Sequence, residues 1–376
     1  MLIDRRMLRS LDGWLIFASV GLILFGLVAV HSATYSLGAG LFSSFFKRQV
    51  MWTVVGLGIT TSMLTFDYRY FGRFSRVLYL GSLAALALVA IGGHTSMGAQ
   101  RWLSLGPLPR VQPSEFVKVA LIITLAKHLD QKDELDRWQD LISPLVHMGI
   151  PVFLILLQPD LGSTIIFAGI TLGMLFVAGI KPAHLLGMVG GGVGLGTLAA
   201  LASRAGWLPL LKEYQIKRLL VFLNPYAYQH DEGWNIIQSM IAIGSGRFFG
   251  KGLFAGSQTQ LNFLPSRHTD FIFSVVGEEL GFIGAIILLG LYFLFLWRSI
   301  QTIAEVDNRF GRLLVAGVFS MFLSHLLINV GMSLGVMPVT GKPLPFISYG
   351  GSSALANYMA LGILLNVNIR RRKIHF

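Results

Sequence analysis

The sequence predicts an all-α integral membrane protein of about ten transmembrane helices, with a long extracytoplasmic loop between helices 7 and 8. Two observations predict this fold. Of 376 residues, 54% are hydrophobic and 13% are charged, whereas an ordinary soluble domain has roughly 25% charged residues. The apolar residues also fall in runs of about 20, the length at which a helix crosses the roughly 30 Å hydrocarbon core of a bilayer.

We expect residues 1–376 to form a single polytopic membrane domain. The apolar runs place its helices near 12–33, 48–66, 76–93, 113–129, 143–158, 161–179, 183–203, 269–297, 311–336 and 348–369. Basic residues flank the first run, at Arg5, Arg6 and Arg9, and the last run, within 370–373. Because positively charged flanks stay in the cytoplasm, we expect both termini on the cytoplasmic side of the cell inner membrane. The net charge of +12 is then explained by basic residues that flank the membrane spans, and we expect no nucleic-acid partner.

The connection 204–268 is too long for an ordinary loop, and we expect function to concentrate there. Residues 207–223 interleave Lys212, Lys217 and Arg218 with leucine, isoleucine and phenylalanine. This pattern suits a helix that lies in the interface, in contact with membrane lipids. A second short helix is predicted over 235–243.

Ionisable residues within or beside the spans need an explanation, because a charge in hydrocarbon costs at least about 2.5 kcal/mol. Glu115 and Lys118 share one helical face at the start of the fourth span. They either form an internal ion pair or border a polar cavity together with Arg101. Asp160, between the fifth and sixth spans, either caps the sixth helix or faces the same cavity.

Asp270 stands where the long loop ends and the eighth span begins, directly after Arg267, His268 and Thr269. Its basic neighbours are expected to favour the ionised carboxylate that a general base needs. The alternative is an aspartate of the first helical turn, stabilised only by the helix dipole.

The same region carries two further groups of charges. Glu278 and Glu279 lie deeper in the eighth span, so we interpret them as a structural acid pair that bonds a basic or polar group of another span. The loop residues Lys217, Arg218, Lys251 and Arg267 are candidates for binding a phosphate or pyrophosphate. Anionic lipid headgroups are an equal alternative for Lys217 and Arg218.

Several common catalytic motifs are absent from the sequence. It has no G-x-x-x-x-G-K-[ST], G-x-G-x-x-G or H-E-x-x-H motif, and no cysteine. ATP-driven, dinucleotide and zincin functions therefore lose support. His325 is expected to be a hydrogen-bonded packing residue, because no second histidine lies at metal-ligand spacing on its helix.

Several strings, in order along the chain, resemble the SEDS family of bacterial cell-wall synthesis. They are GAQRWLSLG, QPSE followed by Lys118, QPDLG, FLPSRHTDFIF followed by GEELG, and GKPLPFISYGGSS. IIQSMIAIGSG and GKGLFAGSQTQLNFLP are more similar to the elongation branch, RodA, than to the division branch, FtsW. The sequence departs from the family pattern at Arg247, Ser266 and Ser163.

The resemblance implies a peptidoglycan glycosyltransferase that polymerises lipid II into β-1,4-linked glycan strands at the outer face of the inner membrane, for cell elongation and rod shape. The implied partner is a class B penicillin-binding protein. By its place in the motif, Asp270 resembles the family's essential acid. The candidate substrate-cavity set is Arg101, Glu115, Lys118, Asp160, Lys217, Arg218, Lys251, Arg267, His268, Thr269, Lys342 and Ser352.

The resemblance also suggests a mechanism. Asp270 would accept a proton from the acceptor sugar's hydroxyl, and undecaprenyl pyrophosphate would leave. A divalent cation (Mg or Mn), an arginine or a lysine would balance the departing charge. The main alternative is a lipid II flippase, since ten helices with buried charges also suit alternating access. A third interpretation is a non-catalytic membrane scaffold.

Overall fold

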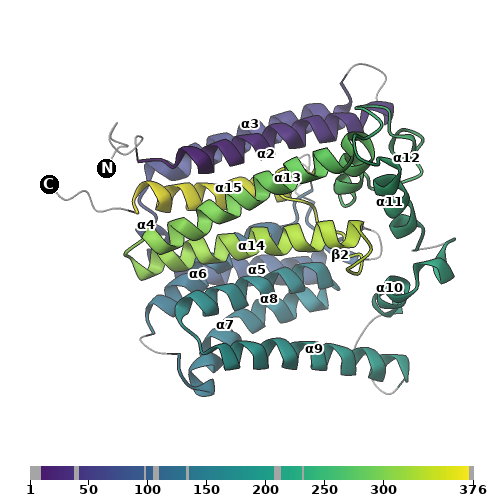
Figure 1. The fold of residues 1–376 in the computed structure, drawn as a ribbon. Helices are drawn as coiled ribbons and strands as arrows, with labels where there is room; N and C mark the ends of the chain where they lie inside the picture. Colours follow the sequence, from purple (N-terminus) through teal and green to yellow (C-terminus); the bar gives the residue numbers. More distant parts are fainter. Residues whose placement is uncertain are drawn as a thin grey trace.

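The computed structural model describes residues 10–37, 42–96, 99–104, 110–132, 135–206, 213–230 and 233–371. Within these residues, ten helices of at least 18 residues form a bundle, with α9 at its margin (Figure 1). They are α2 (Gly13–Ala33), α3 (Ser44–Thr65), α5 (Ser75–Gly92), α6 (Pro113–Asp130), α7 (Trp138–Leu157), α8 (Leu161–Ala178), α9 (Pro182–Arg204), α13 (Ile272–Glu305), α14 (Arg309–Ser333) and α15 (Gly351–Ile369). Each predicted span overlaps one of them, so the predicted all-α, multi-pass architecture is confirmed.

Eight of the ten helices are long and apolar enough to cross a membrane by length and composition. The other two are α3 and α6. Most residues of α6 are buried, including Glu115 and Lys118. Because these side chains face other helices, α6 does not need the apolar surface of a helix exposed to lipid.

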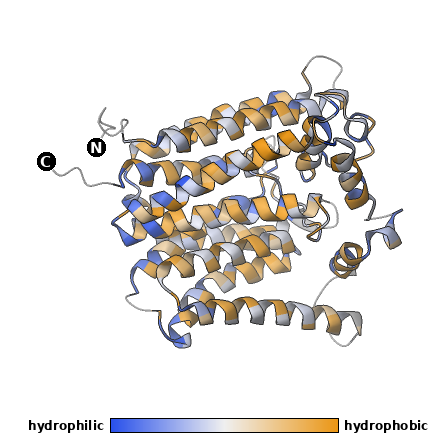
Figure 2. Ribbon diagram, in the orientation of Figure 1, coloured by the Kyte–Doolittle hydropathy of each residue, from blue (hydrophilic) through white to orange (hydrophobic). Residues whose placement is uncertain are grey.

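The first and last described residues meet at one end of the bundle (Figure 1). There the hydroxyl of Ser10 donates to the carbonyl of Ile369 at 2.9 Å. Hydrophilic residues gather at this end and in the loops of the opposite end, while apolar residues dominate the helices between (Figure 2). An even number of crossings fits this arrangement. Arg5, Arg6, Arg9 and 372–373 lie outside the described residues, and the cytoplasmic position of the termini stays a prediction.

The core of the bundle is built around α14, which packs against α6, α8, α13 and α15. Its close approach to α6 depends on Gly317, where an added Cβ would lie 2.6 Å from Ile122. Phe322 of α14 stacks with Phe346 at a ring-centroid distance of 5.3 Å. This contact fixes the segment between α14 and α15, which carries Lys342.

The shorter elements lie at the two ends of the helices. They are η1 (Tyr35–Leu37), α4 (Arg69–Arg73), the antiparallel hairpin β1 (His94–Ser96) and β2 (Ala99–Trp102), α10 (Glu213–Leu223), η2 (Pro225–Tyr228), α11 (Gly233–Ser245) and α12 (Ser257–Gln260). The short helix predicted over 235–243 is confirmed as α11. Of the predicted interfacial helix, 213–223 is helical as α10, and 207–212 lies outside the described residues. The hairpin and α4 were not predicted.

The eighth span departs from its predicted bounds. It was predicted over 269–297, but α13 extends to Glu305 and is broken at Gly281, whose φ is +62°. The backbone amide of Phe282 donates to the carbonyl of Arg247 at 3.0 Å. The chain after α11 therefore inserts against the break, which hydropathy alone could not reveal.

Glu278 and Glu279 anchor that insertion. Glu278 accepts hydrogen bonds from Nζ of Lys251 at 2.8 Å, from the Gln258 amide at 2.9 Å and from the Thr259 amide at 3.0 Å. Glu279 accepts from the hydroxyl of Ser32 in α2 and from Gln260 at 3.2 Å. We expected Glu278 and Glu279 to bond a group of another span. Among the partners named here, Ser32 belongs to another span, and the others come from the loop between α11 and α13.

Candidate active site

A cavity of about 300 Å³ lies at the end of the bundle opposite the chain termini. Its walls come from β2, the start of α6, α10, the turn before α13 and the segment 340–353. Seven of the predicted site residues line it: Arg101, Glu115, Arg218, Thr269, Asp270, Lys342 and Ser352. The structure thus gathers residues that are up to 251 positions apart, from 101 to 352.

Asp270 directly precedes α13 and is half-buried in the cavity wall. Its Oδ2 lies 3.2 Å from the position that a Cβ on Gly341 would occupy, so the carboxyl packs against the Gly341 backbone. Gly341 has a φ of +64°, a conformation that favours glycine. A side chain at this position would crowd Asp270 and strain the turn.

Hydrogen bonds join the turn that carries Asp270 to the segment that carries Lys342. The side-chain amide of Asn329, in α14, donates to the carbonyls of Asp270 and Lys342, each at 2.8 Å. The hydroxyl of Ser348 donates to the carbonyl of Thr269 at 2.5 Å. These bonds hold the backbone on both sides of the cavity in one arrangement.

The proton affinity of Asp270 differs from the prediction. Burial raises the pKa of Asp270 to about 6, although the charges of Lys342, Arg218 and Arg101 act in the opposite direction. The sequence predicted that basic neighbours would dominate and favour the ionised form. That prediction was wrong about the balance, because the cost of removing the carboxylate from water outweighs its cationic surroundings.

The basic neighbours that were predicted for Asp270 do not line the cavity. Arg267 is buried and turns toward α2, where it donates to the Ala33 carbonyl at 2.9 Å and to Ser36 at 3.1 Å. His268 packs its ring 4.8 Å from that of Phe45, and burial lowers its pKa to about 4, with the charge of Arg267 acting in the same direction. It is therefore neutral at pH 7.

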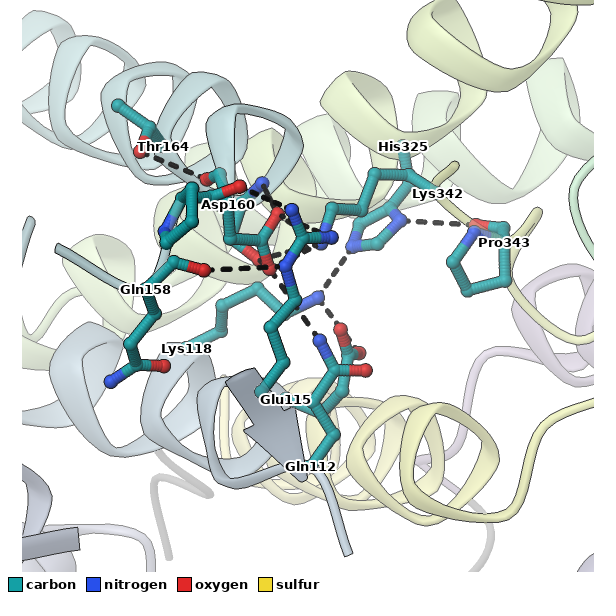
Figure 3. Close-up of polar contacts among 12 residues, drawn as sticks. Gln112, Glu115, Lys118, Gln158, Asp160, Thr164, His325, Lys342 and Pro343 are labelled. Carbon is teal, nitrogen blue, oxygen red and sulfur yellow. Dashed lines mark hydrogen bonds and ion pairs between the residues drawn. The ribbon is translucent and has the colours of Figure 1, made fainter. Parts of the chain in front are cut away.

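Asp160 is not among the residues that line the cavity, but it lies behind the lining residues Arg101 and Lys342, at the centre of a polar network (Figure 3). It accepts from the Ser163 amide at 3.1 Å, so the predicted capping of this helix is confirmed. Its carboxylate also lies 2.9 Å from Nζ of Lys342 and 3.8 Å from the guanidinium of Arg101. Burial opposes ionisation, but Lys342 and Arg101 outweigh it and hold the pKa of Asp160 well below its usual range.

Glu115 and Lys118 form the ion pair that their spacing predicts, with Lys118 Nζ 2.9 Å from Glu115 Oε2. Glu115 also lines the cavity, as Arg101 does, whereas Lys118 is not a lining residue. The ion pair is therefore confirmed, and only its acid borders the cavity. Lys118 is 1% exposed and lies 2.7 Å from Nε2 of His325, whose Nδ1 lies 3.1 Å from the Pro343 carbonyl (Figure 3). His325 is thus the hydrogen-bonded packing residue that was predicted.

The sequence matches the family model of the FtsW, RodA and SpoVE cell cycle proteins over residues 13–373. The chain belongs to this family. It is 38% identical to the probable peptidoglycan glycosyltransferase FtsW of Trichlorobacter lovleyi over 369 residues, covering 96% of this chain and 94% of that protein. It is 31% identical to the peptidoglycan glycosyltransferase RodA of Treponema pallidum, covering 96% and 98%.

A solved structure shows the same fold. It is described as "Structural coordination of polymerization and crosslinking by a peptidoglycan synthase complex", and the matching chain is 35% identical with a TM-score of 0.79. The match covers 96% of this chain and 98% of that one. The resemblance of the motifs to the FtsW/RodA family is therefore confirmed, while the relatives carry names from both branches.

Two further candidates lie outside the cavity of this FtsW/RodA family member. Lys251 pairs with Glu278 instead of facing the cavity. Lys217 is half-buried on α10 and is not a lining residue. Arg218 is the cation of α10 that reaches the cavity, with its guanidinium 5.5 Å from the ring centre of Tyr214.

Some residues of the site were missed by the sequence analysis. Tyr214 lines the cavity and donates its hydroxyl to the Pro159 carbonyl at 2.6 Å. Asn329 positions two wall segments, and a signal for it existed: it is a polar residue within an apolar span, where an unsatisfied amide would be costly. No such signal marks Tyr214, since tyrosine is common wherever helices meet the membrane interface.

The cavity offers one half-buried acid with a proton affinity near neutrality, placed among cationic side chains. A carboxyl with a pKa of about 6 can accept a proton at pH 7 and hold it while bonds rearrange. Glu115 and Asp270 are its two lining carboxylates. Magnesium is commonly held by one or two carboxylates together with substrate phosphates, but the described residues form no cluster of three or more acidic or histidine side chains that could hold a metal ion, and the divalent cation stays a prediction.

Proposed function

We propose that this chain is a peptidoglycan glycosyltransferase that polymerises lipid II, with Asp270 as the general base. The observation that carries the proposal is the position of Asp270, half-buried in the wall of a cavity that is also lined by Arg101, Arg218 and Lys342. Burial, which raises the pKa of Asp270 to about 6, supports its role as a base. Membership of a family whose relatives are named peptidoglycan glycosyltransferases supports the reaction class.

In the proposed reaction, the 4-hydroxyl of the acceptor GlcNAc attacks the anomeric carbon of the donor MurNAc. Asp270 takes the hydroxyl proton as the new C–O bond forms. The bond from the anomeric carbon to the pyrophosphate oxygen breaks, and the electron pair leaves with undecaprenyl pyrophosphate. Attack opposite an α-linked leaving group inverts the configuration and produces the β-1,4 linkage.

The leaving pyrophosphate needs cations that are not already neutralised. Lys342 is held by Asp160 at 2.9 Å, so its charge is largely balanced. Arg218 lines the cavity from α10 without a carboxylate partner in the described part of the chain, and a guanidinium matches phosphate oxygens bidentately. Arg218 is therefore the cation that we assign to the pyrophosphate. A divalent cation bound to the pyrophosphate would supply further charge neutralisation.

We also propose the elongation role, with a class B penicillin-binding protein as partner. The strings IIQSMIAIGSG and GKGLFAGSQTQLNFLP support this branch. The related solved chain comes from a complex described as coordinating polymerization and crosslinking. Rescue of rod shape, but not of septation, in cells depleted of their own enzymes would support the elongation role, and rescue of septation alone would contradict it.

The reaction itself is tested with purified lipid II and the full chain in liposomes, together with a penicillin-binding protein whose transpeptidase is blocked. We expect glycan polymer, detected by gel, and release of undecaprenyl pyrophosphate. Translocation of lipid II across the liposome without polymer would contradict the proposal and favour the flippase. A chain that neither polymerises nor translocates lipid II would favour the scaffold.

A further inference from the structure

A second cavity, of about 380 Å³, lies at the end of the bundle where the described termini meet. Its walls come from α4, the turn between α13 and α14, and the residues that follow α15. Three arginines line it, Arg69, Arg370 and Arg371, against one acid, Asp307. Nothing in the proposed glycan synthesis uses this cavity.

Arg370 is fixed in this cavity by neutral partners. Its guanidinium donates to the side-chain oxygen of Asn366 at 2.6 Å and to the Leu64 carbonyl at 3.0 Å. In the described part of the chain, Arg370 forms no ion pair with a carboxylate. A guanidinium that is already oriented and is not held in an ion pair is suited to bind an anion with little loss of side-chain entropy.

The other two arginines differ in their surroundings. Arg371 is paired with Glu305 at 2.6 Å, so its charge is partly balanced. Arg69 is exposed and lies 5.8 Å from the ring centre of Tyr68, and it too forms no ion pair within the described residues. Arg69 and Arg370 therefore supply most of the available positive charge, and their forks match the oxygens of a phosphate group.

The position of the cavity identifies the source of that phosphate. Its walls are helix ends and turns, and hydrophilic residues gather at this end of the bundle (Figure 2). This is the level at which lipid headgroups surround a multi-pass protein, and basic pockets between transmembrane helices bind anionic headgroups there. We propose that the cavity binds the phosphodiester of an anionic lipid headgroup through Arg69 and Arg370.

The bound lipid connects three separate parts of the chain. Arg69 belongs to α4, Arg370 follows α15, and Asn308 caps the start of α14. A phosphodiester held between them links the end of α15 to the turn before α14. Because ligands that bind only the folded state stabilise it by mass action, the lipid raises the unfolding temperature of the whole chain.

The test uses the full chain in neutral detergent, stripped of lipid, with phosphatidylglycerol as the probe and phosphatidylcholine as the uncharged reference. Binding is followed by native mass spectrometry and by the Tm. In Arg69→Gln we expect about tenfold weaker phosphatidylglycerol binding, equivalent to roughly 1.4 kcal/mol. The matched control is Arg73→Gln, because Arg73 is an exposed arginine of the same helix that stacks on Tyr70 at 4.6 Å and does not line the cavity.

Retention of phosphatidylglycerol binding by Arg73→Gln, with its loss in Arg69→Gln, would support the site. Unchanged binding in Arg69→Gln would overturn the proposal. Equal losses in both variants would also overturn it, because they would indicate diffuse attraction to a basic surface. A third experiment adds inorganic phosphate alone. If phosphate raises the Tm as much as phosphatidylglycerol does at the same concentration, the cavity binds a soluble anion and the lipid proposal is overturned.

Discussion

Nζ of Lys342 lies 2.9 Å from a carboxylate oxygen of Asp160, and both side chains are almost fully buried although the residues are far apart in the sequence. The pair joins the start of α8 to the segment before α15, where Lys342 lines the cavity. Removing Asp160 leaves the Lys342 charge buried without its ion-pair partner, which costs about 3–5 kcal/mol. Removing Lys342 costs less, because Asp160 keeps Arg101 at 3.8 Å.

The first prediction concerns this ion pair. We expect Asp160→Asn and Lys342→Met each to lower the Tm, with the larger effect in Asp160→Asn, and the double variant to be less destabilised than the sum of the two. Thermal unfolding of all four proteins in detergent gives the coupling energy. Strict additivity of the two effects would show that the contact contributes nothing to stability.

The pH dependence of this stabilisation follows from the pKa of Asp160, which is held well below its usual range. For an acid with a lowered pKa, the stabilisation is fully present above its unfolded pKa, about 3.9, and is lost as the pH falls toward the folded value. The wild-type advantage over Asp160→Asn should therefore stay constant from pH 7 to about pH 5. A decline that begins near pH 6.5 would contradict this assignment.

The second prediction concerns the pH profile of polymerisation. Because Asp270 has a pKa of about 6, a general base there gives an acid limb centred near pH 6, with activity rising as the pH increases. Arg218→Gln removes a charge that favours ionised Asp270, so the limb should move to higher pH. Lys217→Gln removes the same charge from the same helix without touching the cavity, and its limb should match the wild type.

The third prediction concerns Asn329, whose amide holds the carbonyls of Asp270 and Lys342. Asn329→Asp keeps the shape of the side chain but replaces the donating amide nitrogen with an oxygen. That oxygen would face two carbonyl oxygens to which it cannot donate a hydrogen bond. We expect kcat to fall by roughly tenfold to a hundredfold, with little change in KM. The matched control, Asn368→Asp, alters a buried asparagine at the far end of the bundle, beside Thr302. A loss of kcat in both variants would indicate a general effect on folding.

The fourth prediction concerns Glu278, which accepts hydrogen bonds from Lys251, Gln258 and Thr259. Glu278→Ala should destabilise the chain by about 2–4 kcal/mol, because it leaves buried donors unsatisfied. Lys251→Met should cost less, since Lys251 is partly exposed and its ion pair is weakened by solvent. In limited proteolysis, the loop between α11 and α12 should be cleaved faster in Glu278→Ala than in Lys251→Met.

Much of the fold could be predicted because hydrophobic runs reveal helices that face lipid. The same signal failed at Gly281, since the break in α13 depends on the distant chain at Arg247. The pairing of Lys118 with Glu115 could be predicted from helical spacing. Lys342 was named from its motif, but its pairing with Asp160 depends on tertiary packing that no local pattern encodes.

The sequence predicted several of the residues that line the cavity, but it did not predict which charges surround Asp270. Asp270 was identified correctly as a cavity residue, whereas Arg267 and His268 were placed there only because they precede it in sequence. The turn before α13 directs Arg267 to α2 and packs His268 on Phe45. The cations that surround Asp270 come instead from α10, β2 and the segment before α15, which become neighbours only in the folded chain.

The central claim is tested most directly by comparing wild type with Asp270→Asn in the lipid II polymerisation assay at pH 7.5, with the Tm measured in parallel. Because burial raises the pKa of Asp270, its ionised form destabilises the fold above about pH 6. Asparagine should therefore increase stability by on the order of 1–2 kcal/mol, after allowing for contact with solvent. We predict no polymer from an Asp270→Asn protein that is at least as stable as the wild type. Polymer at the wild-type rate from that variant would remove Asp270 from the chemistry.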